Sequence, residues 1–116
     1  MSEGIWIALG IGALALVALR VLKGGKVPRN VVQEKLAAGA VVVDVRSPDE
    51  YGRGAYPGAL NIPVQVLGQR MSEIPRGKPV VVYCASGARS AMAAMMLSRA
   101  GYADVVNAGG LGDMPR

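Results

Sequence analysis

The sequence of 116 residues predicts an α/β domain, with a central parallel β-sheet flanked by helices, preceded by one N-terminal transmembrane helix. Three observations lead to this fold class. Two short apolar runs, at 40–46 and 78–83, have the length and the valine content of strands that are buried on both faces. Segments with helix-capping residues alternate with these runs, as in parallel sheets. A longer apolar run, at 4–19, precedes all of them.

The N-terminal run reads GIWIALGIGALALVAL and contains no charged or strongly polar side chain. Continued to Leu22, it forms a helix of about 28 Å, close to the hydrocarbon thickness of a bilayer, about 30 Å. Its apolar residues lie on all sides of such a helix, which disfavours an amphipathic surface helix. We therefore expect residues 1–23 to be a membrane anchor, with the span from Ile5 to Leu22 in the bilayer. A cleaved signal peptide and a buried core helix are the alternatives.

The charges around this run predict its orientation. Signal peptides carry positive charge before the apolar run, whereas here Glu3 precedes it and Arg20 and Lys23 follow it. Since positive flanks stay on the cytoplasmic side, we expect a single-pass protein of the inner (cytoplasmic) membrane, with its domain facing the cytoplasm. Residues 24–26 then form a short linker, and residues 27–116 form the domain.

The first half of the domain shows two capped helices on either side of a strand. An Asn cap at Asn30, with a glutamine three residues later and a closing glycine, predicts a helix over 30–39. The first buried strand follows at 40–46. Ser47 then starts a second helix, because a proline follows it at once and a glutamate stands three residues on.

The second half of the domain continues this alternation. After a turn at 56–59, a proline leads into a helix over 64–71. A polar break precedes the second strand at 78–83, and a helix over 90–100 ends at a glycine. A last short strand is expected at 104–106.

Two polar residues stand where the predicted strands end. Asp44 lies near the end of the first strand, and Cys84 follows the second. Ligands of parallel α/β sheets bind beyond the carboxyl ends of the strands. We therefore expect both side chains at the same edge of the sheet.

The composition excludes several kinds of site. Cys84 is the only cysteine, so an internal disulfide and a CxxC metal or redox pair are impossible. The chain contains no histidine, which excludes a Cys-His dyad, a Ser-His-Asp triad and a His-ligated zinc site. The net charge of +5 comes from scattered basic residues without interleaved aromatics, so we do not expect nucleic-acid binding. No metal is expected.

The surroundings of Cys84 can activate its thiol without an imidazole. The loop between strand and helix exposes backbone N–H groups at the positive end of the helix dipole, which favours a thiolate. Gly87 allows a left-handed turn there, and Arg89 adds a positive charge. On spacing alone, a buried structural cysteine and a solvated arginine remain open. Asp44 and Arg46 can equally be a structural ion pair.

Three stretches of the chain resemble a known family. The first is VVVDVRSPDEYGRG at 41–54, followed by PGALNIP at 57–63; the second is CASGARS at 84–90; the third is NAGGLGDM at 107–114. In this order and spacing they resemble a single-domain rhodanese, a sulfurtransferase, and the resemblance covers residues 27–114.

The resemblance implies a mechanism and a set of site residues. Cys84 would take the outer sulfur of thiosulfate or of another persulfide donor, hold it as a persulfide, and pass it to cyanide or to a thiol. No metal or organic cofactor is implied. The loop that would hold the persulfide and the small anionic donor consists of Ala85, Ser86, Gly87, Ala88 and Arg89. The supporting residues would be Asp44, Arg46 and Ser90.

Two other functions compete with sulfur transfer. Cysteine phosphatases and arsenate-reductase-like enzymes use a Cys-x5-Arg loop, whereas here Arg89 stands five positions after Cys84, so the loop is one residue shorter. A non-catalytic rhodanese-fold binding module at the membrane usually lacks the cysteine.

Because Ala85 and Ala88 supply no charge, we expect thiosulfate to be a poor substrate and another persulfide to be the donor.

Overall fold

The computed structural model describes residues 24–116. The predicted membrane span from Ile5 to Leu22 lies outside these residues, so its place in a bilayer stays a prediction. Among residues 24–116, no helix combines the length and the apolar composition that crossing a membrane requires.

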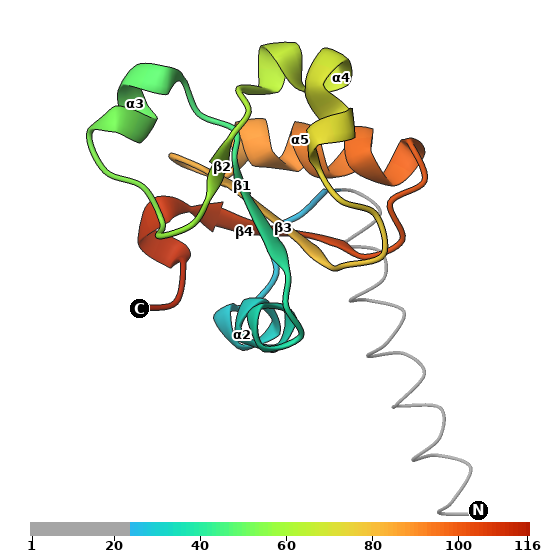
Figure 1. The fold of residues 1–116 in the computed structure, drawn as a ribbon. Helices are drawn as coiled ribbons and strands as arrows, with labels where there is room; N and C mark the ends of the chain where they lie inside the picture. Colours follow the sequence, from blue (N-terminus) through green and yellow to red (C-terminus); the bar gives the residue numbers. More distant parts are fainter. Residues whose placement is uncertain (1–23) are drawn as a thin grey trace, which may run out of the picture.

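Within the described residues, four parallel strands form the central sheet in the order β2-β1-β3-β4 (Figure 1). The strands are β1 (Val41–Asp44), β2 (Leu60–Asn61), β3 (Val80–Cys84) and β4 (Val105–Gly110). β3 lies between β1 and β4, and every one of its residues is buried. Because all strands run in the same direction, their carboxyl ends share one edge, where Asp44 and Cys84 are the last residues of their strands.

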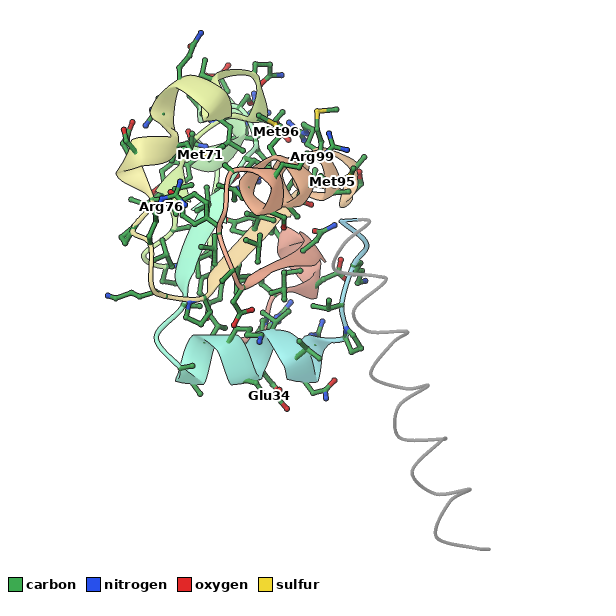
Figure 2. The ribbon with its side chains drawn as sticks, turned by 90° about the vertical axis from the view of Figure 1, so that its right-hand side faces the viewer. Glu34, Met71, Arg76, Met95, Met96 and Arg99 are labelled. Carbon is green, nitrogen blue, oxygen red and sulfur yellow. The ribbon has the colours of Figure 1, made fainter. Side chains whose placement is uncertain are left out.

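Helices cover both faces of the sheet (Figure 1). One face packs against α2 (Arg29–Ala37), and the other packs against α4 (Leu67–Arg70) and α5 (Ala88–Arg99). The short helix α3 (Pro48–Gly52) follows β1. Figure 2 shows Glu34 of α2 at the bottom of the view and Arg99 of α5 in its upper part, with the sheet between the two helices.

Side chains alternate between the two faces along β3. Val80, Val82 and Cys84 belong to the apolar cluster under α5, whereas Val81 and Tyr83 belong to the cluster under α2. This alternation follows from the two-residue period of a strand. The thiol of Cys84 therefore lies on the face that α5 covers.

The segment before α2 extends the sheet beside β4. Lys26 forms an isolated parallel bridge with Asn107, and the Val27 N–H donates to the Asn107 carbonyl over 2.9 Å. The Asn107 side-chain amide donates to the Gly24 carbonyl, also over 2.9 Å. Gly24 packs so closely against the Ala91 carbonyl of α5 that a Cβ would collide with it. The residues expected to form a linker are therefore bonded to the domain.

The predicted α/β fold with a central parallel sheet is confirmed, but the strand bounds differ. The strand predicted at 40–46 is Val41–Asp44, and the strand predicted at 104–106 extends to Gly110. β2 was not predicted, because two residues carry no periodic signal. It is a strand only through its pairing with Val43 and Asp44 of β1.

The helix predicted over 64–71 is confirmed only in part, as the α-helical turn of α4. Short 3-10 turns at Val64–Val66 and Met71–Glu73 flank the single turn of α4. The backbone leaves the helical region at Val66 and Arg70, both with φ −112°. β-branched valines near the start of this segment weaken its helix propensity, so tertiary packing decides its path.

The capping predicted at Asn30 is wrong. α2 begins at Arg29 with Pro28 as its N-cap and without a side-chain cap bond, so Asn30 lies inside the first turn. The end of the helix is as predicted, since Gly39 takes a left-handed φ of +84° just past it. The capping box at Ser47 is confirmed, with its hydroxyl accepting from the Glu50 N–H.

Candidate active site

Cys84 ends β3 and is followed by a tight turn into α5. Gly87 is the N-cap of α5 with φ +102°, in the left-handed region that favours glycine. A Cβ on Gly87 would also lie 3.4 Å from the Gly109 Cα, because the end of β4 packs beside the loop. α5 thus begins two residues earlier than predicted, and Arg89 and Ser90 lie in its first turn.

Three residues of the loop and the helix start act on the Cys84 sulfur. The Gly87 N–H donates to Sγ over 2.9 Å, and the Ser90 hydroxyl lies 3.3 Å from Sγ. Burial raises the pKa of the Cys84 thiol, but hydrogen bonds from the Ser90 hydroxyl and from the N–H groups of Ser90, Gly87 and Ser86 outweigh it. The pKa of the thiol is therefore lower than its ordinary value, which favours the nucleophilic thiolate.

Arg89 is paired with an acidic residue that the sequence did not single out for the site. Its Nη1 and Nη2 donate to the two carboxylate oxygens of Glu50 over 2.7 and 3.0 Å. The hydrogen bond with Arg89 is the largest effect that lowers the pKa of Glu50 to about 2. Arg89 is thus neither an isolated positive charge at the loop nor a solvated arginine.

Asp44 and Arg46 form a buried ion pair behind the loop. The Arg46 Nη2 donates to Asp44 Oδ2 over 2.6 Å, and the Asp44 side chain is fully buried. The Tyr83 hydroxyl also donates to Asp44 Oδ2, over 2.7 Å. Burial raises the pKa of Tyr83 to about 12, so this hydroxyl keeps its proton. Arg46 further donates to the Gly54 carbonyl over 2.8 Å, which holds the segment after α3.

The structure therefore places the predicted site residues in two groups. The thiol group contains Cys84, its loop and Ser90, on the α5 side of the sheet. The ion-pair group contains Asp44 and Arg46, which reach the loop through Tyr83, the neighbour of Cys84 in β3. The part of the second group in any reaction stays a prediction.

The sequence analysis did not identify three residues that contribute to the site. Glu50 had a signal as the third position of a capping box, but no local pattern links it to Arg89, 39 residues away. Tyr83 read as one more buried strand residue. Asn107 donates to both the Gly24 and the Gly87 carbonyls and accepts from the Gly109 N–H. No sequence pattern in its short strand predicted these hydrogen bonds.

The loop and the start of α5 present hydrogen-bond donors to one sulfur atom. These donors converge on Sγ from Gly87 and Ser90. Among residues 24–116, no three His, Cys, Asp or Glu side chains come together as a set of metal ligands. What the geometry can do is hold the Cys84 sulfur as a thiolate.

The sequence of this chain matches a protein family and several known proteins. A protein-family profile described as "Rhodanese-like domain" matches residues 29–112. A protein named "Sulfurtransferase" from Allochromatium vinosum is 46% identical over 67 residues, covering 58% of this chain and 63% of that protein. "Thiosulfate sulfurtransferase PspE" from Escherichia coli is 40% identical over 74 residues, covering 62% of this chain and 71% of that protein.

A solved structure has a similar fold. The structure described as "rhodanese with anions from E. coli" superposes with a TM-score of 0.61 at 40% identity, covering 66% of this chain and 94% of that chain. The match to the Allochromatium protein spans less than two thirds of that protein's length.

Proposed function

Because this chain belongs to the rhodanese-like domain family, we propose that it is a sulfurtransferase that moves sulfane sulfur through a persulfide on Cys84. The observation that carries the proposal is the Sγ environment, in which Gly87 and Ser90 direct donors at the sulfur. Relatives named as sulfurtransferases support the same class of activity. The donor is thiosulfate or another persulfide, and the acceptor is a thiol or cyanide.

The first half-reaction loads sulfur onto the enzyme. The Cys84 thiolate attacks the outer sulfur of the donor, and a bond forms between Sγ and that sulfur. The bond that joined this sulfur to the rest of the donor breaks. The departing group takes the electron pair, leaving as sulfite from thiosulfate or as a thiolate from an organic persulfide. The lowered pKa of Cys84 increases the fraction of the thiol that is present as the nucleophilic thiolate.

The second half-reaction empties the enzyme. An acceptor thiolate, or cyanide, attacks the outer sulfur of the Cys84 persulfide, and Sγ departs with the electron pair. The donors from Gly87 and Ser90 stabilise Sγ as the thiolate that departs, so the same contacts serve both halves. The loop from Ala85 to Arg89 holds the persulfide, with the Gly87 N–H bonded to Sγ. Asp44 and Arg46 hold Tyr83 and thereby the end of β3.

Mass spectrometry tests the proposal directly. The full chain, reduced and kept in mild detergent, is incubated with thiosulfate or with cysteine persulfide, and its intact mass is measured. We expect a gain of one sulfur atom that dithiothreitol removes, and no gain for Cys84→Ser. An unchanged mass with both donors would show that the chain is not a sulfurtransferase of this kind.

We also propose that the segment from Ile5 to Leu22 holds the domain at the cytoplasmic face of the inner membrane. The support is the apolar run and the order of charges around it, Glu3 before and Arg20 and Lys23 after. The full chain should resist carbonate extraction from membranes. Protease added to intact spheroplasts should leave the domain uncut; digestion without lysis would refute the orientation.

A further inference from the structure

Glu50 joins the start of α3 to the start of α5 at the edge of the sheet where the thiol lies. Its carboxylate accepts from Arg89 Nη1 over 2.7 Å and from Nη2 over 3.0 Å. The same carboxylate accepts from the N–H and the hydroxyl of Ser47, both over 3.1 Å. The side chains of Arg89 and Glu50 are 34% and 29% exposed, so a ligand that reaches the guanidinium also meets the carboxylate.

The Glu50–Arg89 pair leaves the mouth of the loop with little net charge. In the segment CASGARS, Arg89 is the only charged residue. The exposed loop residues Ala85, Ser86 and Ala88 carry no charge. A dianionic donor drawn to Arg89 therefore also meets the negative charge of Glu50, and this repulsion offsets the attraction.

The backbone donors of the loop do not replace the missing charge. The Gly87 nitrogen lies 2.9 Å from Sγ, and its N–H group already donates to that sulfur. The N–H groups of Ser86 and Ser90 likewise stabilise the thiolate form of Cys84. The loop is built around one sulfur atom with one negative charge. The sulfonate end of thiosulfate gains little from these donors.

We propose that Glu50 is a specificity-determining residue, which makes the site prefer sulfur donors with one negative charge over dianions such as thiosulfate. This inference rests on the proposed function, because it concerns which donor loads Cys84. It assigns organic persulfides as the preferred donor class. The transferable end of such a donor carries at most one negative charge.

A charge comparison separates Glu50 from other determinants of rate. Repulsion from a single carboxylate grows in proportion to the donor's charge, so its effect on the rate constant is squared for a dianion. If Glu50 disfavours a monoanion by about threefold, it disfavours a dianion by about tenfold. Methanethiosulfonate is the matched monoanion, because a methyl group replaces one oxygen of thiosulfate and the transferable sulfur is unchanged.

The experiment measures kcat and KM for thiosulfate and for methanethiosulfonate, with cyanide as acceptor, for the full chain in detergent. Glu50→Gln removes the charge but keeps an acceptor for the capping box. We expect its kcat/KM to rise about tenfold for thiosulfate and about threefold for methanethiosulfonate, through KM rather than kcat. Glu50→Asp keeps the charge and should retain the wild-type preference.

Glu73 provides a matched control. It accepts two hydrogen bonds from Arg70, over 2.7 and 2.9 Å, in the segment that leads into the start of β3, away from the thiol edge. Glu73→Gln should leave both KM values unchanged. A second measurement uses salt. In Glu50→Gln, where Arg89 has lost its carboxylate partner, added salt should raise the KM for thiosulfate more than the KM for methanethiosulfonate, because it screens the attraction to Arg89. In the wild type the two KM values should respond to salt alike, because the pair carries little net charge.

The outcomes separate a failure of the inference on Glu50 from a failure of the proposed function. Equal changes for both donors in Glu50→Gln, or a higher KM for thiosulfate, would mean that Glu50 only positions Arg89 for the donor, and the inference would be wrong. A thiosulfate KM in Glu50→Gln that rises with salt no faster than the KM for methanethiosulfonate would refute it as well. No transfer from either donor by the wild type would instead overturn the proposed function, and the inference with it.

Discussion

Removing the hydroxyl of Ser90 should make the thiol of Cys84 less reactive at low pH. In the structure this hydroxyl lies 3.3 Å from Cys84 Sγ and also 3.3 Å from the Gly109 carbonyl oxygen. Among the groups that lower the pKa of the thiol, the Ser90 hydroxyl has the largest effect. In Ser90→Ala the pKa of Cys84 should therefore rise, and the pH profile of its reactivity should move to higher pH.

The size of this effect follows from the geometry. Hydrogen bonds to charged groups contribute about 1.5–3 kcal/mol. The 3.3 Å separation from Sγ is long, and the hydroxyl has one proton to share between two acceptors, so the lower end of that range applies. A loss of about 1.4 kcal/mol is a factor of about ten in the thiolate fraction at a pH well below the pKa. The alkylation rate there should fall about tenfold.

The assay is alkylation of Cys84 by iodoacetamide, followed by intact mass over a range of pH. Well above the pKa of the thiol, wild type and Ser90→Ala should react at similar rates, because both are thiolates there. Ser98→Ala, on the same helix, is the control and should match the wild type throughout. Equal rates for Ser90→Ala and wild type at acidic pH would show that the backbone N–H groups alone activate the thiol.

Three further predictions concern the residues around the loop. Asp44→Ala leaves the buried Arg46 without its carboxylate and should destabilise the fold by about 3–5 kcal/mol, seen as a lower thermal unfolding midpoint; replacing both residues by apolar ones should cost less, and an equal cost would contradict this. Gly110→Ala should impair both folding and sulfur loading, because its Cβ would collide with the Ala85 carbonyl; wild-type loading would be evidence against this close approach. The pKa of Glu50 is lowered from 4.5 to about 2, so its contribution to stability should be complete above pH 4.5 and lost as the pH falls toward 2. When thermal unfolding midpoints are measured against pH, the difference between the midpoints of wild type and Glu50→Gln should disappear only between pH 4.5 and 2.

The strands that form the middle of the sheet were predictable because their amino-acid composition indicates that they are buried. β3 and β1 are runs of valine buried on both faces, and such runs have few other stable places in a soluble domain. β2 could not be predicted, because Leu60 is exposed and the strand exists only through its register with β1. The path of residues 64–73 likewise depends on packing under α5 rather than on propensity.

The candidate site was partly predictable for a related reason. The loop from Cys84 to Ser90 consists of consecutive residues, so the end of the strand, the glycine turn and the start of the helix could be predicted from one short stretch of sequence. The ionic partners are not local. Arg89 pairs with Glu50 across 39 residues, and Tyr83 reaches Asp44 across the same separation. Such pairs depend on strand order and register, which short-range patterns do not specify.

The bonding of Asn107 decides how the domain would respond to mechanical force. Tension on the N-terminus enters at Gly24, where the chain lies parallel to β4. The Asn107 bonds to Gly24 and to Val27 are then loaded together in shear, rather than broken one after another. The same side-chain amide donates to the Gly87 carbonyl, so the N-terminal segment and the turn beside the thiol are joined through one side chain. A domain tethered through its N-terminus would in this way couple pulling to the geometry around its reactive sulfur.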